Sequence, residues 1–308
     1  MRWKLALHSI SYSGSWPGQL QIGLPEFLEK ARALGFDSVM LMARRPHLAP
    51  IDYSPPQRRA LRDRMDGLGL EVDCLASYTN FCISDSSLKV PHRELQLLYL
   101  TDLARMANDL GTSLIRVFTG QPDPRLSFEE NWRNCVQALR EASRRVADHG
   151  VTLGVQNYHD LAMSAKSLRK LLREIDEPNC RAMFDAWGPT MQGIDLHGAV
   201  EEIVSLMTHT TVADYDRRPR RTYVPAVPPL VDTVRDEQIQ AVPVGEGIVD
   251  YRGFLTALSR HGYSGSVAYE MCTPLQGGGS EANLDRCARH FLKFMSQLEA
   301  PAPPGRKS

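Results

Sequence analysis

The sequence predicts an α/β protein that folds as a single (β/α)8 TIM barrel. A helix-to-strand joint with Gly at its centre recurs along the chain, because Gly enters the left-handed conformation just past a helix end without a Cβ clash. The joints read Leu34-Gly35-Phe36, Leu68-Gly69-Leu70, Leu110-Gly111-Thr112, His149-Gly150-Val151 and His261-Gly262-Tyr263. Each follows a helical pattern and precedes a short apolar run, which indicates alternating helices and strands.

The spacing of the joints predicts eight strand–helix units. The first four glycines are 34, 42 and 39 residues apart, and the last gap of 112 residues leaves room for about three more units of roughly 30 residues. Eight alternating units are typical of a (β/α)8 barrel, whose chemistry lies at the C-terminal ends of the strands.

The elements follow in order along the chain. Apolar runs predict strands at residues 4–11, 38–42, 71–77, 113–119, 152–158, 181–185, 208–215 and 266–271. Helices are expected from Pro25, a favourable first helical residue, to Gly35, then up to Gly69, and over 93–110. A capping box, Ser127-Phe128-Glu129-Glu130, opens a long helix, and the closing helix begins at residue 280 or 281.

We expect one barrel domain over residues 1–298 and a disordered tail over 299–308, where Pro and Gly dominate. A formal net charge of zero argues against a nucleic-acid partner. No apolar run approaches the length of a membrane span, and the first residues lack the apolar core of a signal peptide. Six scattered cysteines without a CxxC pair favour reduced thiols and a cytoplasmic protein.

Two loops attract attention. The segment after the seventh strand, residues 215–244, is the longest loop and carries several Arg and Pro residues, including Arg217. This length and composition favour a stiff lid that covers the substrate site. After the second strand, Leu48 and Ile51 are expected to be exposed and are compatible with a homo-oligomer interface.

The strand ends hold polar residues that together suggest a metal site. Asp185 and Glu270 close the sixth and eighth strands, Gln156 the fifth, and His209 lies on the seventh. Two carboxylates, an amide oxygen and an imidazole form a plausible oxygen-rich site for a divalent cation, Mn²⁺ or Mg²⁺, with Zn²⁺ or Co²⁺ as alternatives. The competing interpretation is that each carboxylate forms a salt bridge with an arginine such as Arg116.

The stretch Val244-Gly245-Glu246-Gly247-Ile248-Val249-Asp250-Tyr251 resembles a motif of the xylose-isomerase-like barrels. His261-Gly262-Tyr263-Ser264-Gly265 and Tyr269-Glu270 fit the segment that ends in the last metal-ligand Glu of that family. The resemblance covers nearly the whole chain. It implies a sugar isomerase, epimerase or related enzyme with metal ligands at Asp185 and Glu270.

The chain departs from the family at the other ligand positions. The position on the fifth strand, commonly Glu, is Gln156, and the ligand His of the seventh strand falls on Thr211, with His209 two residues deeper. A third position, often His, is Gly188. Gln cannot act as a base, so the two-Glu proton shuttle of the epimerases is not intact.

This loss directs attention to other candidates. The general base is His159, just past the fifth strand, or Glu270; alternatively, His159 is an ordinary loop histidine. The remaining substrate-binding candidates are His8, His47, Asp214, Arg217 and Glu246. Glu246 is alternatively structural, holding the turn of its loop, and His209 is alternatively a core histidine.

We therefore expect a metal-dependent sugar isomerase or epimerase that acts on a keto-sugar, polyol or sugar derivative through an enediolate. A metal-dependent lyase or dehydratase, working by β-elimination on a keto-sugar or keto-glycoside, is the alternative, and a non-catalytic sugar-binding barrel is a third reading. A DNA-repair endonuclease of the same superfamily is disfavoured because its additional His ligands are absent and the chain is not basic.

Overall fold

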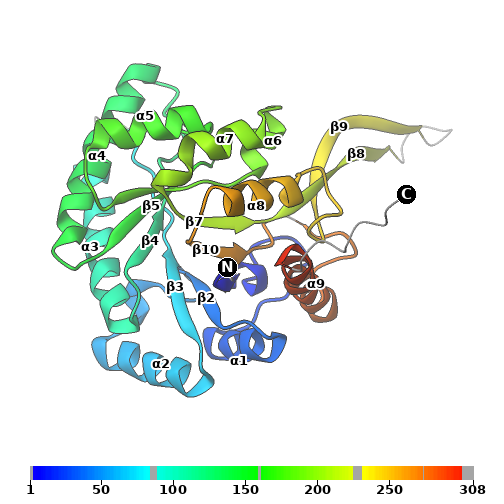
Figure 1. Cartoon of the computed structure of the whole chain (residues 1–308), viewed down its shortest axis with the longest axis horizontal. Helices are drawn as coiled ribbons and strands as arrows, with labels where there is room; N and C mark the ends of the chain where they lie inside the picture. Colours follow the sequence, from blue (N-terminus) through cyan, green and yellow to red (C-terminus); the bar gives the residue numbers. More distant parts are fainter. Residues whose placement is uncertain (1–2, 84–88, 159–160, 225–230, 273, 300–308) are drawn as a thin grey trace.

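The strands close into one parallel barrel surrounded by helices (Figure 1). The computed structural model describes residues 3–83, 89–158, 161–224, 231–272 and 274–299, and the side chains of 220–237 and 299 are outside this description. The barrel order is β1-β10-β7-β6-β5-β4-β3-β2. The predicted fold class is therefore confirmed.

Eight strands form the barrel, and each pairs in parallel with its neighbours. Their bounds are β1 Leu5–His8, β2 Ser38–Met42, β3 Glu71–Ala76, β4 Leu114–Val117, β5 Thr152–Gln156, β6 Cys180–Met183, β7 Met207–Val212 and β10 Ser266–Tyr269. All eight predicted strands are present, although several end earlier than expected. The chain after β1, for example, turns into the 3₁₀ helix η1 at Ser9–Tyr12 instead of continuing the strand.

Helices cover the outside of the barrel. They are α1 Leu24–Leu34, α2 Pro55–Leu68, α3 His92–Leu110, α4 Phe128–Ala147, α5 Ala165–Ile175, α6 Trp187–Met191, α7 Leu196–Ile203, α8 Tyr251–Arg260 and α9 Glu281–Glu299, with short 3₁₀ segments η2 Pro50–Asp52 and η3 Val204–Leu206. The predicted capping box opens α4, since the Ser127 hydroxyl accepts from the Glu130 N–H and the Glu130 carboxylate accepts from the Ser127 N–H.

The long segment after β7 is a β-hairpin, not the irregular loop that its Arg and Pro content suggested. Strands β8 Asp214–Val224 and β9 Val231–Val242 pair antiparallel, from Asp214 opposite Val242 to Val224 opposite Val231. The hairpin extends away from the barrel wall (Figure 1). A lid role therefore has no support from its position.

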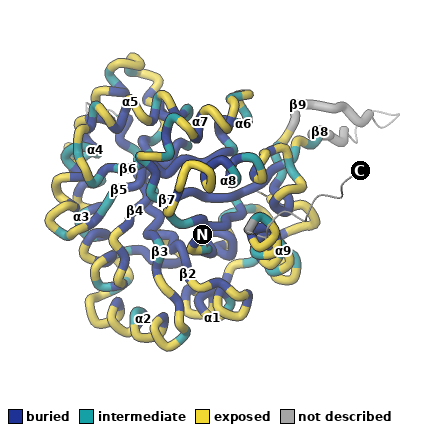
Figure 2. Tube along the Cα trace, viewed as in Figure 1, coloured by how far each residue is buried: buried dark blue, intermediate teal, exposed yellow. Residues whose placement is uncertain are grey.

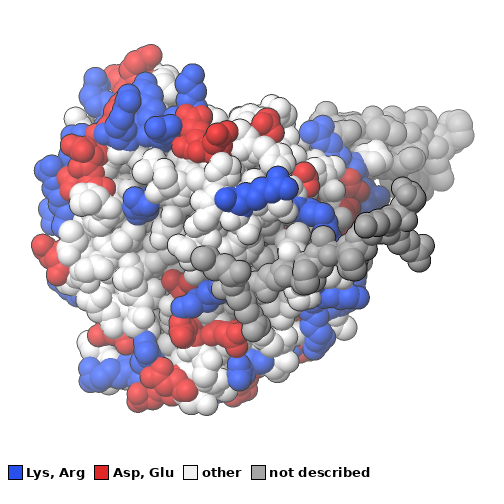
Figure 3. Space-filling model, in the orientation of Figure 1, with Lys and Arg blue, Asp and Glu red and all other residues white. Residues whose placement is uncertain are grey.

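Buried residues follow the strands and the inner faces of the helices (Figure 2). Lys, Arg, Asp and Glu side chains are interspersed over the outer helices (Figure 3). No disulfide joins the six cysteines in the part of the chain that the structure describes, in line with the expected thiols. Leu48 is fully buried, so its expected exposure was wrong, whereas Ile51 is 86% exposed. Among the described residues, no helix has the length and apolar character needed to cross a membrane. The tail was predicted over 299–308; residue 299 is the last of α9, and residues 300–308 lie outside the described residues.

The recurring glycine joint has the conformation that the sequence predicts. Gly69 ends α2 with φ at 64°, and its N–H donates to the carbonyls of Met65 and Asp66. Any other residue at this φ pays a steric penalty because its Cβ approaches the following carbonyl. Gly67, two residues earlier, lies inside α2 and does not have a positive φ.

These two glycines make a matched test of the joint, because an added Cβ would meet no atom within 4 Å at either position. Gly69→Ala should lower the free energy of unfolding by about 1 kcal/mol through backbone strain. Gly67→Ala should raise it by about 0.5–1 kcal/mol through helix propensity. Urea unfolding of both variants measures the difference, and equal effects would contradict the left-handed joint.

Candidate active site

A buried polar cluster links the C-terminal ends of β4, β5, β6 and β7. The Gln156 amide donates from Nε2 to Asp185 Oδ2 at 3.2 Å and to Thr211 Oγ1 at 2.9 Å. The Thr211 hydroxyl donates to the same Asp185 oxygen at 2.7 Å. Arg116 NH1 in turn donates to Gln156 Oε1 at 3.1 Å. All four side chains are buried, so the network replaces the water that these groups would otherwise bind.

The backbone around Asp185 is held by a neighbour on β5. The Asn157 amide accepts from the Asp185 N–H at 2.6 Å and donates to the Asp185 carbonyl at 3.0 Å. Asp185 Oδ1 accepts from the Trp187 N–H at 2.8 Å, at the start of α6. Hydrogen bonds to both carboxyl oxygens and to the main chain of Asp185 therefore fix its position.

Glu270 follows β10 and faces the same space. Its N–H donates to the Val212 carbonyl at 3.1 Å, which ties the segment to β7. Its Oε2 lies 3.7 Å from His8 Nε2, and both side chains are buried. Burial raises the pKa of Glu270, while the Arg116 guanidinium and the Cys272 thiol oppose that rise. The carboxylate therefore sits close to a proton donor, a thiol and a cation.

The charge of Glu270 acts on the carboxyl group of Asp185. Burial raises the pKa of Asp185 to about 7, and the charge of Glu270 adds to the rise. The hydrogen bonds from Trp187, Thr211 and Gln156 oppose it but do not cancel it. Two carboxyl groups in one dry space do not readily share two negative charges, so one of them holds a proton near neutral pH.

His8 has the geometry of a neutral hydrogen-bond donor. Its Nδ1 accepts from the Ile10 N–H at 3.3 Å, so its proton is on Nε2, the atom that faces Glu270. Burial, followed by the charge of Arg116, holds the pKa of His8 well below its usual value. Nε2 has no hydrogen-bond partner among the described residues. The structure thus places His8 where a substrate oxygen can accept its proton.

His209 lies in a different polar group at the N-terminal end of the barrel. Its Nε2 lies 2.7 Å from Asp73 Oδ2, and Ser266 Oγ donates to the other oxygen of Asp73 at 2.5 Å. Ser266 opposes His209 in the ladder and precedes Glu270 by four residues, or roughly 13 Å of strand. This pairing matches the core-histidine alternative and separates His209 from the predicted metal ligands.

The chemistry of the donor atoms tests whether a divalent cation fits this site. Gln156 Oε1 must be the atom that faces Arg116, because a guanidinium only donates; Nε2 then points at Asp185. A cation beside Asp185 would therefore meet amide hydrogens. Among the residues that the structure describes, no three His, Cys, Asp or Glu side chains are arranged to hold an ion. The residues present do not fit the predicted metal.

Asp214 is a structural residue of the Gly245-Glu246-Gly247 loop. Its oxygens accept from the N–H groups of Tyr215, Gly245, Gly247 and Val249 at 2.8–3.3 Å. A Cβ at Gly247 would lie 2.1 Å from Asp214 Oδ1, so this contact requires glycine. The carboxylate that holds the loop is thus Asp214, whereas Glu246 is exposed and lines a surface hollow against α9.

The other candidate site residues lie away from the polar cluster around Asp185 or outside the residues that the structure describes. His47 donates from Nε2 to the Ile22 carbonyl at 3.1 Å and stacks on Phe27, so that nitrogen already has a partner. Arg217 is exposed on β8. His159 lies outside the described residues, so its role stays a prediction.

Sequence reasoning missed the aromatic side chains beside the cluster. The Trp187 and Tyr215 rings lie 4.8 Å apart after β6 and β7, and the Phe118 and Tyr158 rings lie 5.1 Å apart after β4 and β5. Phe118, Tyr158 and Tyr215 lie at the ends of predicted strands and Trp187 lies two residues past one, which was the available signal. Cys272, two residues past Glu270, carried the same signal. Aromatic walls around a few polar groups are typical of small-molecule sites.

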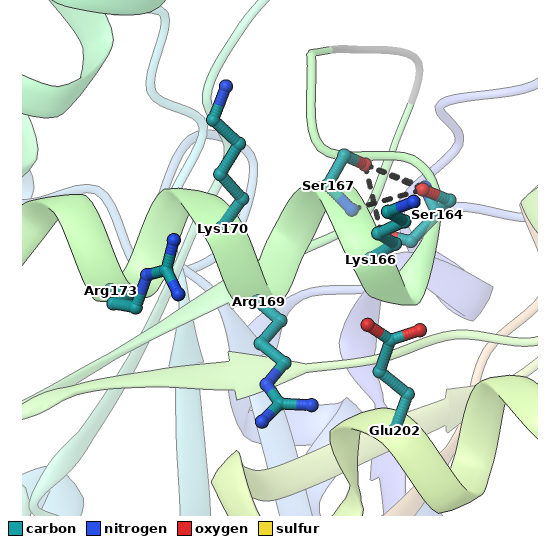
Figure 4. Close-up of a pocket in the computed structure, with 7 residues that line it drawn as sticks. All are labelled: Ser164, Lys166, Ser167, Arg169, Lys170, Arg173 and Glu202. Atoms are coloured by element: carbon teal, nitrogen blue, oxygen red, sulfur yellow. Dashed lines mark hydrogen bonds between the residues drawn. The ribbon is translucent and has the colours of Figure 1, made fainter.

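A hollow on the outer helices has a different character (Figure 4). Its side chains project from α5, together with Glu202 of α7, and four of them are cations. The lining residues are Ser164, Lys166, Ser167, Arg169, Lys170, Arg173 and Glu202. Since none comes from a strand end, we assign the chemistry to the barrel cluster instead.

The comparisons with known proteins agree with this fold. A family model described as xylose isomerase-like TIM barrel matches residues 28–294. The putative L-ribulose-5-phosphate 3-epimerase SgbU of Escherichia coli (strain K12) is 25% identical over 260 residues, which cover 81% of this chain and 84% of that protein.

Two solved structures illustrate the range of chemistry on this fold. D-psicose 3-epimerase from Clostridium cellulolyticum H10 is 20% identical, with a TM-score of 0.72, and the match covers 96% of this chain and 99% of that chain. The probable 3-DHS dehydratase AsbF from Bacillus anthracis is 18% identical, with a TM-score of 0.67 and coverage of 96% and 99%. At these identities the solved structures establish likeness of fold alone.

The loop contact of Asp214 gives a stability prediction. Asp214→Asn exchanges one acceptor oxygen for an NH2 group that faces backbone N–H donors, so the free energy of unfolding should fall by about 2 kcal/mol. Glu246→Gln, in the same loop but exposed, should change it by less than about 0.5 kcal/mol. Chemical unfolding compares the two. An equal loss in both would show that Glu246 also holds the loop.

The raised pKa of Asp185 gives a pH prediction. The folded chain favours the protonated acid, so its contribution to stability is complete below the unfolded pKa of about 3.9 and is lost as pH rises through about 7. Between these values the stability of the wild type should fall, relative to Asp185→Asn, by on the order of 2–4 kcal/mol. Unfolding curves at several pH values test this; parallel curves for the two proteins would contradict it.

Proposed function

The chain belongs to the xylose isomerase-like TIM barrel family, and we propose that it is a sugar isomerase or epimerase that moves a proton next to a carbonyl group. One observation carries the proposal. Two buried carboxyl groups, Asp185 and Glu270, face the same space at the C-terminal strand ends, and the charge of Glu270 raises the pKa of Asp185. Pairs of titratable groups with such coupled environments are typical of acid–base sites.

In this proposal Glu270 is the general base. Its raised pKa brings it closer to neutrality, which increases its ability to accept a proton from carbon. The electron pair of the broken C–H bond moves to the carbonyl oxygen and gives an enediolate. His8 Nε2–H, 3.7 Å from Glu270, is positioned to donate to a substrate oxygen. Return of the proton from Glu270 to the neighbouring carbon gives the isomer. The epimer needs a proton delivered to the other face of the same carbon, and the protonated Asp185 is the acid for that step.

The substrate class follows from the relatives and the site. A keto-sugar or its phosphate supplies a carbonyl with an acidic neighbouring C–H, and the names of the relatives suggest L-ribulose 5-phosphate and D-psicose as the first compounds to assay. The aromatic pairs Trp187–Tyr215 and Phe118–Tyr158 provide apolar faces against which a sugar ring can pack. The predicted Mn²⁺ or Mg²⁺ has no step in this mechanism, because the donor atoms do not fit it.

Gln156 favours a second candidate, a lyase. An amide cannot act as the second base of a two-base epimerisation, and its orientation is fixed by Arg116. A β-elimination needs one base and one acid, and Glu270 with a protonated Asp185 supplies both. Elimination releases water or an alcohol and leaves an unsaturated ketone, so its product differs from an epimer.

The reaction in D₂O tests the proposal. A competent keto-sugar should gain deuterium at one carbon, and NMR of the product separates an epimer from an unsaturated ketone. Glu270→Gln should lower kcat by about 10²–10⁴-fold, because the base is removed without a change in shape. Glu201→Gln, on the exposed face of α7, is the matched control and should leave the rate unchanged. Turnover without label at carbon would overturn the proton-transfer mechanism.

A further inference from the structure

We propose that the Arg116 guanidinium, not a bound divalent cation, supplies the positive charge of this active site. This inference rests on the proposed function for its chemical meaning, but its binding test does not. It depends on the place of Arg116, the orientation of Gln156 and the charges that surround them.

Arg116 is fixed inside the barrel. It lies on β4, is 3% exposed, and donates from NH2 to the Ser77 carbonyl at 2.9 Å and from NH1 to Gln156 at 3.1 Å. Its guanidinium carbon lies 4.1 Å from the centre of the Phe118 ring and 4.9 Å from that of Tyr78. A planar guanidinium packed against two aromatic rings is restricted in orientation. Its Nε has no hydrogen-bond partner among the described residues.

A buried guanidinium cannot lose its proton, so its charge must be balanced locally. No carboxylate lies within salt-bridge distance of Arg116 among the described residues, yet its charge lowers the pKa of both His8 and Glu270. The carboxyl groups across the cluster, Asp185 and Glu270, are therefore the counter-charge. A divalent cation added beside them would leave the buried cluster with excess positive charge.

The orientation of Gln156 carries the same conclusion. The only atom of this side chain that can bind a cation is Oε1, and it accepts from Arg116, so a cation on its second lone pair would lie beside the guanidinium charge. The Thr211 hydroxyl, at the position where the resembling family has a His ligand, directs its proton at Asp185. In a site that binds a cation, the side chains at these two positions would direct lone pairs at the ion. Here Gln156 and Thr211 instead donate hydrogen bonds to the Asp185 carboxyl group.

Arg116 then has a defined place in the reaction. When Glu270 takes the proton from carbon, negative charge develops on the carbonyl oxygen. A fixed cation in a site without water stabilises that oxygen without reorganisation. We call Arg116 a positioning and charge-supplying residue, since its contacts run through Gln156.

The test is Mn²⁺ binding, measured by calorimetry and by the loss of the free Mn²⁺ spin signal, on protein stripped with chelator. The wild type should bind no Mn²⁺ saturably, even at millimolar concentration. Saturable binding of about one Mn²⁺ per chain that is lost in Asp185→Ala/Glu270→Ala would overturn the inference. Neither outcome requires a substrate, so failure here is distinct from failure of the proposed epimerase.

A second variant asks whether Arg116 is what excludes the ion. Arg116→Met/Gln156→Glu removes the guanidinium and restores a carboxylate on β5, so it should gain saturable Mn²⁺ binding. Circular dichroism shows whether the double variant is folded. If the double variant does not fold, the single variant Arg116→Met is measured in its place. A folded variant that still binds no Mn²⁺ would contradict the role of Arg116.

Activity distinguishes charge from packing at the same position. If a substrate is turned over, chelator should leave the rate of the wild type unchanged, and Arg116→Met should lower kcat far more than it changes KM. Arg116→Lys should recover part of kcat, because it restores the charge without the planar contacts. The inference would be overturned if added Mn²⁺ alone restored the activity of Arg116→Met and if chelator also removed the activity of the wild type.

Discussion

The charge of Arg116 is the constraint on which the rest of the site depends. A guanidinium packed against two aromatic rings inside a barrel has to be balanced by groups that are equally buried. Gln156 accepts from it and passes hydrogen bonds on to Asp185, so the charge and the carboxyl group are linked through one amide. Burial and the charge of Glu270 raise the pKa of Asp185, so the site limits the negative charge that the two carboxyl groups carry together.

The surrounding structure holds this network rigid by backbone contacts. Asn157 binds both the N–H and the carbonyl of Asp185, and the Tyr251 hydroxyl contacts the N–H and the carbonyl of Ala213, just before Asp214. Asp214 in turn binds four N–H groups around the adjoining loop. Such contacts leave the acid–base groups little freedom, and a fixed geometry is what proton transfer to carbon needs.

The departures from the resembling family form one consistent set. Gln156 stands where the family commonly has a carboxylate, and Thr211 stands where it has an imidazole ligand. In this chain the two side chains bond to each other, and the Arg116 guanidinium contacts the Gln156 amide directly. The barrel thus retains its two carboxyl groups, Asp185 and Glu270, while the groups around them change, which is how one fold supports different chemistry.

The sequence by itself determined the eight strands, the glycine joints, the capping box at Ser127 and the placement of Asp185 and Glu270 at strand ends, because these follow from local backbone preference and apolar periodicity. Only the tertiary structure decided which side chains meet. The pairing of His209 with Asp73 joins residues 136 positions apart, and the contact of Arg116 with Gln156 joins residues 40 apart. The β8–β9 hairpin was also missed, since its Arg and Pro content lacks a clear strand pattern. Burial and long-range pairing decide these features, and neither is encoded in local spacing.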